Sequence, residues 1–233
     1  MNHLKMISII IPTYNEAENI KKIVPLIYKH MKKDYEIVIV DDNSPDKTWQ
    51  IAQKMPKKYK IRVIRRTKER GLATAVIRGF KEAKGNIIGV IDADLSHPPK
   101  MIPKLVAAIK DGNCVAVGSR HVKGGGCENW PVHRKMISKG ATLMARPLTR
   151  VKDPMSGFFF FKKDILKGVT LKPKGYKILL EILVKGRYSK NKVKEIPFIF
   201  KDRELGKSKL GFNVYIDYLK HLGSLFKYKT MGK

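Results

Sequence analysis

Residues 87–99, with the sequence IIGVIDADLSHPP, decide the fold of this chain. The apolar start of this segment is typical of a strand that is buried on both faces in a parallel sheet. Pro98 and Pro99 cannot continue a hydrogen-bonded ladder, so the strand ends before them. Asp92 and Asp94 therefore fall at the carboxyl edge of a central strand, which is where open α/β sheets bind ligands.

The spacing of these two acids indicates a cation. Two carboxylates that lie close together repel one another unless a positive charge joins them. Oxygen ligands that share a hard divalent ion with substrate phosphates are the usual arrangement for Mg²⁺ or Mn²⁺. A lone D-x-D pair also occurs as a solvated turn at a strand end, so the interpretation depends on the rest of the chain.

Predicted strands and helices alternate on both sides of this segment. Alternation of this kind predicts a doubly wound parallel sheet over the first ~120 residues. The predicted strands cover residues 6–12, 35–40, 61–64, 87–91 and 114–118, and the predicted helices lie between them.

Polar side chains follow other strands at the same edge of the predicted sheet. Tyr14 and Glu16 follow the first strand, and Asp41 and Asp42 follow the second. A ring that can stack and carboxylates that accept from hydroxyl groups suit a nucleotide. There is no G-x-G-x-x-G motif after the first strand and no G-x-x-x-x-G-K-[ST] motif, which counts against an NAD enzyme and a P-loop NTPase.

The second half of the chain is more basic and contains a predicted two-faced helix at residues 131–147. Such a helix can lie in a membrane interface or pack on the sheet, and the pattern alone leaves both open. An aromatic strand at residues 158–161, a helix at 175–183, a strand at 193–200 and a helix at 213–229 follow. The cationic face of the first helix contains Lys135, Lys139 and Arg146, and its apolar face contains Met136, Ile137, Leu143 and Met144.

The charge of the chain indicates an anionic partner. Lys and Arg total 49 against 20 Asp and Glu, a net charge of +29. Nucleic acid, a phospholipid surface and a phosphorylated substrate are the candidate partners. The two cysteines form no C-x-x-C pair, which fits a reducing compartment. The sequence shows no signal-peptide core. It also shows no apolar run near the ~18 residues needed to span a bilayer, so we expect a soluble or surface-bound protein.

An ordered set of motifs resembles family 2 inverting glycosyltransferases, which have the GT-A fold. The resemblance runs from residue 6 to about residue 225, and within the family it is strongest to members that transfer mannose to dolichyl phosphate. Its segments are 11–16 (IPTYNE), 41–46 (DDNSPD), 92–99 (DADLSHPP), 119–120 (SR), 129–131 (NWP), 153–158 (DPMSGF) and 208–210 (SKL).

The resemblance implies an α/β, Rossmann-like GT-A fold, with a mixed, mainly parallel sheet flanked by helices and a basic amphipathic helix after the central sheet. Residues 1–233 would be a single catalytic domain. Its nucleotide-binding half would be residues 6–120, and residues 121–233 would form the acceptor-binding half with the C-terminal helix.

The resemblance also assigns site residues. Ser96 would lie at the metal, at a position where some relatives have Gln. Its hydroxyl would contact the metal directly or through a water. Implied ligands of the guanosine of GDP-mannose are Pro12, Tyr14, Glu16, Val40 and Asp42. The ribose, the diphosphate and Mg²⁺ or Mn²⁺ would be held by Asp92, Ala93 and Asp94, and Arg203 and Lys209 would close over the diphosphate. The acceptor phosphate would be held by Arg120, Arg134 and Ser138, and the catalytic residues would be Asp94, Arg120 and Arg134.

The implied reaction transfers mannose from GDP-mannose to dolichyl (polyprenyl) phosphate with inversion at the anomeric carbon. It would take place on the cytoplasmic face of an anionic membrane, and its product, dolichyl-phosphate mannose, would be used for glycosylation. One alternative is a UDP-glucose-dependent transferase acting on the same lipid, or another family 2 glycosyltransferase. Another is a nucleic-acid-binding protein, suggested by charge alone. The chain lacks an RNP-type strand, a KH-type loop and zinc spacing, so we expect no nucleic acid.

His97 directly precedes Pro98 and Pro99, and we interpret it as a turn residue.

Overall fold

The fold was analysed in a computed structural model, which describes residues 6–31, 33–128, 130–172, 177–201 and 212–231. The strands are β1 (Ile7–Thr13), β2 (Tyr35–Asp41), β3 (Ile61–Arg65), β4 (Ile87–Val90), β5 (Val115–Ser119), β6 (Gly126–Cys127), β7 (Phe159–Lys162), β8 (Val193–Pro197) and β9 (Ile199–Phe200). The α-helices are α1 (Ala17–Met31), α2 (Thr48–Lys54), α3 (Leu72–Glu82), α4 (Ile102–Lys110), α5 (Val132–Ala145), α6 (Ile178–Lys185) and α7 (Phe212–Thr230).

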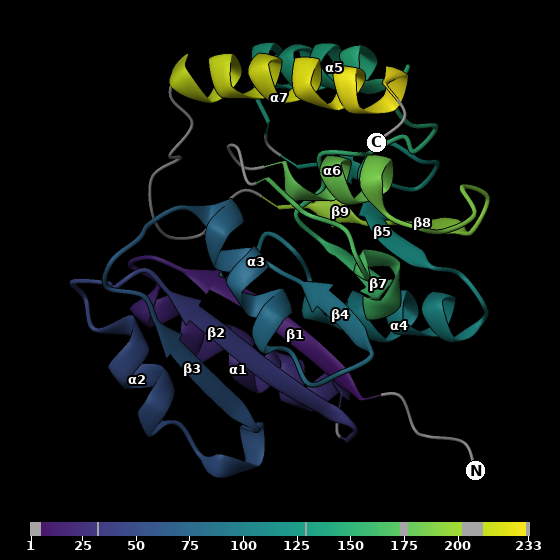
Figure 1. Ribbon diagram of the computed structural model, residues 1–233. Helices are drawn as coiled ribbons and strands as arrows, with labels where there is room; N and C mark the ends of the chain where they lie inside the picture. The colour runs from purple at the N-terminus through teal and green to yellow at the C-terminus, as the bar shows by residue number, and fades with distance from the viewer. Residues whose placement is uncertain (1–5, 32, 129, 173–176, 202–211, 232–233) are drawn as a thin grey trace.

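Seven strands form a twisted central sheet in the order β3-β2-β1-β4-β7-β5-β8 (Figure 1). Strand β1 is parallel to β2 and to β4, and β5 is parallel to β8. Strand β7 is antiparallel to both of its neighbours, β4 and β5. The mixed, mainly parallel sheet is therefore confirmed. The strands predicted for the first ~120 residues, β1 to β5, all run in one direction, because β7 is antiparallel to both β4 and β5. The prediction did not include the later strand β7, which is inserted between β4 and β5.

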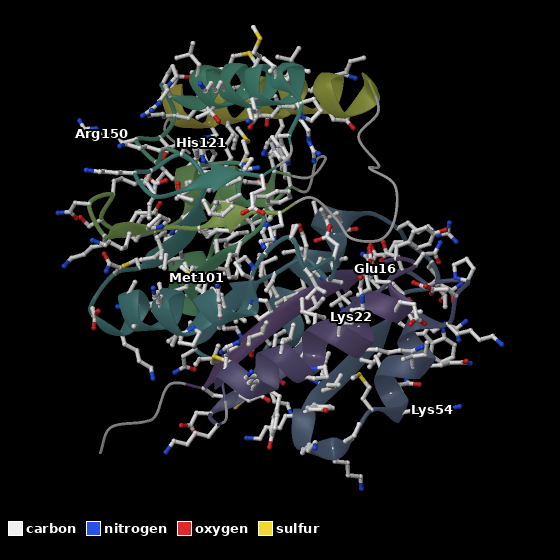
Figure 2. The ribbon with its side chains drawn as sticks, turned by 180° about the vertical axis from the view of Figure 1, so that it is seen from behind. Glu16, Lys22, Lys54, Met101, His121 and Arg150 are labelled. Atoms are coloured by element: carbon white, nitrogen blue, oxygen red, sulfur yellow. The ribbon has the colours of Figure 1, made fainter. Side chains whose placement is uncertain are left out.

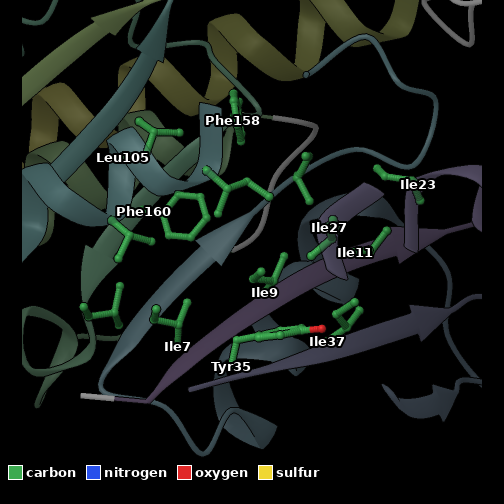
Figure 3. Packing of buried hydrophobic residues seen from close by; sticks show 14 of the residues in the cluster. Ile7, Ile9, Ile11, Ile23, Ile27, Tyr35, Ile37, Leu105, Phe158 and Phe160 are labelled. Atoms are coloured by element: carbon green, nitrogen blue, oxygen red, sulfur yellow. The ribbon is translucent and has the colours of Figure 1, made fainter. Parts of the chain in front are cut away.

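Phenylalanines explain the central position of β7. Phe158, Phe159, Phe160 and Phe161 are all completely buried. Successive strand residues point to opposite faces, so Phe158 and Phe160 pack with α1 and α4 (Figure 3), while Phe159 and Phe161 pack with α3 and α6. A strand that is apolar on both faces is stable only inside a sheet that is covered on both sides.

Helices α5 and α7 form a separate pair that lies across one end of the sheet (Figure 1). The Tyr218 hydroxyl of α7 donates to the Ala141 carbonyl of α5 at 2.6 Å. Tyr218, Leu222 and Leu225 of α7 are buried in this pair, whereas Leu219 is 54% exposed. Within the part of the chain that the structure describes, no helix is both long and apolar enough to cross a membrane.

The apolar face of α5 does not pack on the sheet. Val132, Met136 and Leu143 are 72%, 67% and 71% exposed. The predicted final strand is also divided, because β8 joins the main sheet whereas β9 pairs with β6 in a second, two-stranded sheet. This small sheet brings residues 126–127 beside residues 199–200.

Gly89 determines whether β7 can enter the sheet, because it is paired with Phe160 and a methyl group there would overlap the phenyl ring. We predict that Gly89→Ala lowers the free energy of unfolding by roughly 1–3 kcal/mol, the usual effect of overpacking a core. Gly140→Ala is the control, since Gly140 lies in α5 with open space around it and should gain roughly 0.5–1 kcal/mol. Urea unfolding measures both, and equal stability of the two variants would contradict the role of Gly89.

Candidate active site

The carboxyl ends of β1, β2 and β4 meet at one edge of the sheet because these strands are parallel. Thr13 pairs with Asp41, and Ile10 pairs with Val90. A cavity of about 340 Å³ opens at this edge. Its lining consists of Pro12, Thr13, Tyr14, Glu16, Asp42, Arg70, Gly71, Leu72, Ala75, Asp92, Ala93, Asp94, Met155, Gly157 and Lys177.

Most of the predicted nucleotide-sugar ligands line this cavity. They are Pro12, Tyr14, Glu16, Asp42, Asp92, Ala93 and Asp94, and Figure 2 shows Glu16 beside β1. Val40 does not line it, because its side chain is completely buried in the core with Val38 and Ile88. Arg203 and Lys209 lie outside the described residues.

Asp42 is held in place by a buried arginine. Arg66 is 4% exposed; its Nε donates to Oδ1 of Asp42 at 2.7 Å, and its Nη2 pairs with the same oxygen at 2.5 Å. The other oxygen, Oδ2, accepts from the Gly71 backbone N–H at 2.8 Å. Gly71 has a φ of +134°, which favours glycine. Asp42 therefore presents a fixed carboxylate whose oxygens already have protein partners.

The loop after β2 supports the start of α1. The backbone N–H groups of Asn15, Glu16 and Ala17 donate to the side chains of Ser44, Thr48 and Asp46 at 3.0, 2.9 and 3.0 Å. These polar side chains satisfy amides that the start of a helix leaves without partners. They also fix the backbone that carries Tyr14 and Glu16 into the cavity.

Asp94 is oriented by its neighbour. The Ser96 hydroxyl and backbone N–H donate to Oδ1 of Asp94 at 2.6 and 3.1 Å, and both residues are buried. Asp92 is more open, with a side chain that is 33% exposed. Ser96, predicted to contact a metal, thus holds the carboxylate beside it in a fixed direction.

His97 does more than form a turn. It is 3% exposed, and its Nδ1 accepts from the Asp92 backbone N–H at 3.3 Å. Its ring stacks on Phe158 at 5.2 Å between centroids. Gly157 completes this corner, since a Cβ there would lie 3.2 Å from both Oδ2 of Asp92 and Cε1 of His97. The backbone thus passes close to the acid, as the small-residue turn before the aromatic strand indicates.

The oxygen ligands in the cavity fit Mg²⁺ or Mn²⁺. Among the described residues no group of three or more His, Cys, Asp or Glu could hold a metal, so Asp92 and Asp94 supply only part of a coordination shell. Hard divalent ions bound by one or two carboxylates take their other ligands from substrate phosphates and water. The site therefore suits a metal that arrives with a phosphorylated ligand.

Arg120 forms a buried ion pair with Asp153, at the rim between the sheet and α5. Its Nε and Nη2 donate to the carboxylate at 2.8 and 2.7 Å, and its backbone N–H donates at 2.9 Å. Burial opposes both charges, but the hydrogen bonds outweigh it, lowering the pKa of Asp153 and raising the pKa of Arg120. The charge of Asp92 also raises the pKa of Arg120. The Cζ atom of Arg120 lies 5.8 Å from the ring centroid of Phe200, which lies 5.6 Å from the ring of His97 beside Asp92.

The structure brings the predicted acceptor residues together. Arg120 and Arg134 both contact the ring of Trp130, with Cζ atoms 5.4 and 4.1 Å from its centroid. Ser138 follows Arg134 by one turn of α5 and is partly buried.

Sequence reasoning missed Lys177, which lines the cavity directly before α6. Burial, and then the nearby charge of Arg120, lower the pKa of Lys177 to about 8, although Asp153 and Asp92 act in the opposite direction. A signal was present in the sequence, because a lysine directly before the apolar residues 178–180 must find a polar environment. Asp153, Arg66 and Arg70 were missed because their partners are distant in sequence.

Fold and site together define an α/β protein with an acidic cavity at the carboxyl edge of its sheet, the edge where such folds bind ligands. The chain belongs to glycosyl transferase family 2, whose family model matches residues 8–170. This confirms the family that the ordered motifs predict, and it leaves the nucleic-acid-binding alternative without support.

Curated relatives cover nearly the whole chain. Dolichol-phosphate mannosyltransferase from Pyrococcus furiosus is 54% identical over 96% of this chain, which spans 64% of the length of that relative. The protein of the same name from Saccharomyces cerevisiae is 40% identical, with 95% of this chain and 87% of the relative covered. The name of both relatives matches the subgroup of the family that the sequence motifs most resemble.

Solved structures share the fold. Glucosyl-3-phosphoglycerate synthase from Mycobacterium tuberculosis, with phosphoglyceric acid, matches with a TM-score of 0.70 at 18% identity, covering 94% of this chain and 80% of that one. The same enzyme with Mn²⁺, UDP and glucosyl-3-phosphoglycerate matches with a TM-score of 0.66 at 19% identity, covering 97% and 77%. The predicted GT-A fold is confirmed.

We predict that Arg66→Met lowers the free energy of unfolding by about 3–5 kcal/mol, because it leaves the Asp42 charge buried without its partner. Arg65→Met is the control: Arg65 is the adjacent residue, exposed, with a hydrogen bond to Asn43, and its loss should cost less than about 1 kcal/mol. Guanidinium unfolding followed by circular dichroism compares the two. Similar losses in both variants would show that Arg66 does not anchor the cavity.

Proposed function

We propose that this chain transfers mannose from GDP-mannose to the phosphate of dolichol or a related polyprenol, with inversion at the anomeric carbon. The observation that carries the proposal is the proximity of two sites. A cavity with Asp92 and Asp94 adjoins a pair of arginines, Arg120 and Arg134, within one domain. The names of the relatives from Pyrococcus furiosus and Saccharomyces cerevisiae support the choice of sugar and acceptor.

Residues 6–120 would bind the donor. The ring of Tyr14 is covered by Arg70, with a Cζ-to-centroid distance of 5.1 Å, and can stack on a nucleoside base. Glu16 and Asp42 accept from hydroxyl or amino groups, and Asp92 and Asp94 would hold Mg²⁺ or Mn²⁺ with the diphosphate. That ion would act as a Lewis acid toward the leaving diphosphate.

Residues 121–233, together with Arg120, would bind the acceptor. A phosphate monoester is already ionised near neutral pH, so it requires orientation rather than removal of a proton. Arg120 has two of its donor groups engaged by Asp153, which fixes the plane of the guanidinium. Arg134 and Ser138 lie on one side of α5 and would complete the grip on the phosphate. No general base is needed, which agrees with the engagement of His97 Nδ1 by Asp92.

Lys177 would stabilise the departing diphosphate. It lies in the cavity close enough to Asp92 and Arg120 to sense both charges. An ammonium aimed at developing negative charge in a site with little water lowers the barrier. Its position before α6 is fixed by the packing of Ile178 and Leu179 in the core.

A donor with a different base and sugar, such as UDP-glucose, is the second candidate. The Mycobacterium tuberculosis enzyme that shares the fold has been solved with UDP-glucose, and at this level of identity only the fold is common. Competition of unlabelled GDP-mannose and UDP-glucose for turnover of labelled GDP-mannose separates the two donors.

Helix α5 would dock the enzyme on the cytoplasmic face of an anionic membrane. Its exposed apolar residues Val132, Met136 and Leu143 are bordered by the exposed Lys135 and Lys139, and side chains of the α5–α7 end project away from the sheet (Figure 2). A helix with this distribution enters the headgroup region, and each basic residue near an anionic leaflet adds about 1 kcal/mol. The lipid acceptor is found at that surface.

We predict that Asp94→Asn lowers mannosyl transfer at least about 10²-fold, since it removes a charge that binds the metal and diphosphate. The assay follows labelled GDP-mannose, dolichyl phosphate and Mg²⁺ or Mn²⁺ by extraction of label into organic solvent. Asp111→Asn, an exposed acid after α4, should leave the rate unchanged. Near-normal transfer by Asp94→Asn with metal present would refute the assignment.

We predict that Met136→Ser with Leu143→Ser weakens binding to vesicles of anionic phospholipid by about tenfold or more, because the two changes remove exposed apolar contacts worth about 1.5–3 kcal/mol each when buried. Vesicle flotation measures the bound fraction. Leu26→Ser, an exposed apolar residue of α1, is the control and should bind like the unchanged chain. Equal binding by all three proteins would exclude α5 as the docking helix.

A further inference from the structure

Trp130 lies between β6 and α5 and has no assigned role in the reaction described above. It is 9% exposed, and the edge of its ring meets Phe200 with centroids 5.3 Å apart. Its Nε1–H is buried and finds no hydrogen-bond acceptor among the described residues. A buried N–H that has lost water without gaining an acceptor is unfavourable, and a ligand that accepts a hydrogen bond from it would remove this cost.

Two guanidinium groups share the ring of Trp130. The Cζ atom of Arg134 lies 4.1 Å from the ring centroid, and that of Arg120 lies 5.4 Å from it. Like charges gathered at one point repel, and the negative face of an indole ring attracts each of them. Asp153 compensates Arg120 through two hydrogen bonds. The ring therefore sets the positions of both cations relative to one another.

The cations and the donor N–H lie in the same small region, at the border of the donor cavity. The Cζ atom of Arg120 lies 5.8 Å from the ring centroid of Phe200, and that ring lies 5.6 Å from the ring of His97. His97 accepts from the backbone N–H of Asp92, which lines the cavity. Two guanidinium ions and an indole N–H, which all favour negative charge, thus belong to one cluster around Trp130, beside the acids that would hold the donor. Oxygen atoms of a phosphate monoester are suited to all three.

We propose that Trp130 is part of the acceptor site: its ring positions Arg120 and Arg134, and its indole N–H donates to the phosphate of a polyprenyl phosphate. The proposal rests on the proposed function, since it deepens the acceptor half of that site. It predicts recognition of a phosphate monoester and no recognition of the corresponding alcohol.

Two substitutions separate the ring from the N–H. Trp130→Phe keeps an aromatic face but removes the donor, and it should raise the KM for farnesyl phosphate about 3–10-fold with the KM for GDP-mannose unchanged. Trp130→Leu removes both and should raise the acceptor KM about 30-fold or more, again without an effect on the donor KM. Parallel increases in both KM values, or an unchanged acceptor KM in Trp130→Leu, would overturn the proposal.

Trp49 provides a matched control. It stacks with Arg65, with a Cζ-to-centroid distance of 4.0 Å, but it does not line the cavity. Trp49→Leu removes a tryptophan–arginine contact of the same kind and should leave both KM values within about twofold of the original. An equal rise in acceptor KM for Trp49→Leu would show that loss of any such contact disturbs the protein, which would overturn the specific role of Trp130.

Fluorescence tests binding without the transfer reaction. Trp49→Phe leaves Trp130 as the single tryptophan of the chain. Farnesyl phosphate should change its emission with saturation, whereas farnesol at the same concentrations should not, and inorganic phosphate shows whether the headgroup alone suffices. Arg134→Gln in this background should weaken farnesyl phosphate binding about tenfold. A saturable phosphate-dependent change supports the site even if mannose is not the sugar transferred; equal responses to farnesyl phosphate and farnesol, or none, would refute it.

Discussion

The central constraint on this molecule is the gathering of acidic groups at one edge of its sheet. Asp41, Asp42, Asp92, Asp94 and Asp153 all lie near the carboxyl ends of strands, where mutual repulsion works against folding. Each acid is therefore held by a partner. The hydroxyls of Thr13 and Ser44 donate to Asp41, while Asp42 and Asp153 are paired with buried arginines. Asp94 accepts from Ser96, and Asp92, with a side chain that is 33% exposed, is the most open of the five acids.

Those pairings explain why the two halves of the chain form one site. The first half supplies the carboxylates that follow β2 and β4. The antiparallel strand β7 then carries residues 153–157 to the same edge, where Asp153 takes up Arg120 and Gly157 closes on Asp92. Arg120, at the end of the first half, is thus paired with Asp153 of the second half, and Lys177 of the second half lines the cavity beside Asp92. In the proposed function, this arrangement would hold a diphosphate and a phosphate monoester, both anionic, side by side.

The sequence was sufficient for those features that depend on local pattern. Strand ends, the alternation of strands and helices, and the motifs around Asp92 and Asp94 predicted the fold and most of the donor cavity. Contacts between distant segments were not predictable, because a pattern records neither the partner of Asp42 nor the insertion of β7 beside β4. Val40 shows the converse: it adjoins a site motif in sequence, but strand alternation turns its side chain into the core. The exposed apolar face of α5 depended on tertiary packing, which periodicity does not contain.

The most direct test of the central claim is calorimetric titration of the chain with GDP, first with Mn²⁺ present and then with EDTA in its place. If Asp92 and Asp94 hold a cation together with a nucleoside diphosphate, GDP should bind saturably with Mn²⁺, and its affinity should fall by about tenfold or more without the metal. Equal affinity in the two conditions would contradict the account, because the paired carboxylates would then have no part in binding the diphosphate.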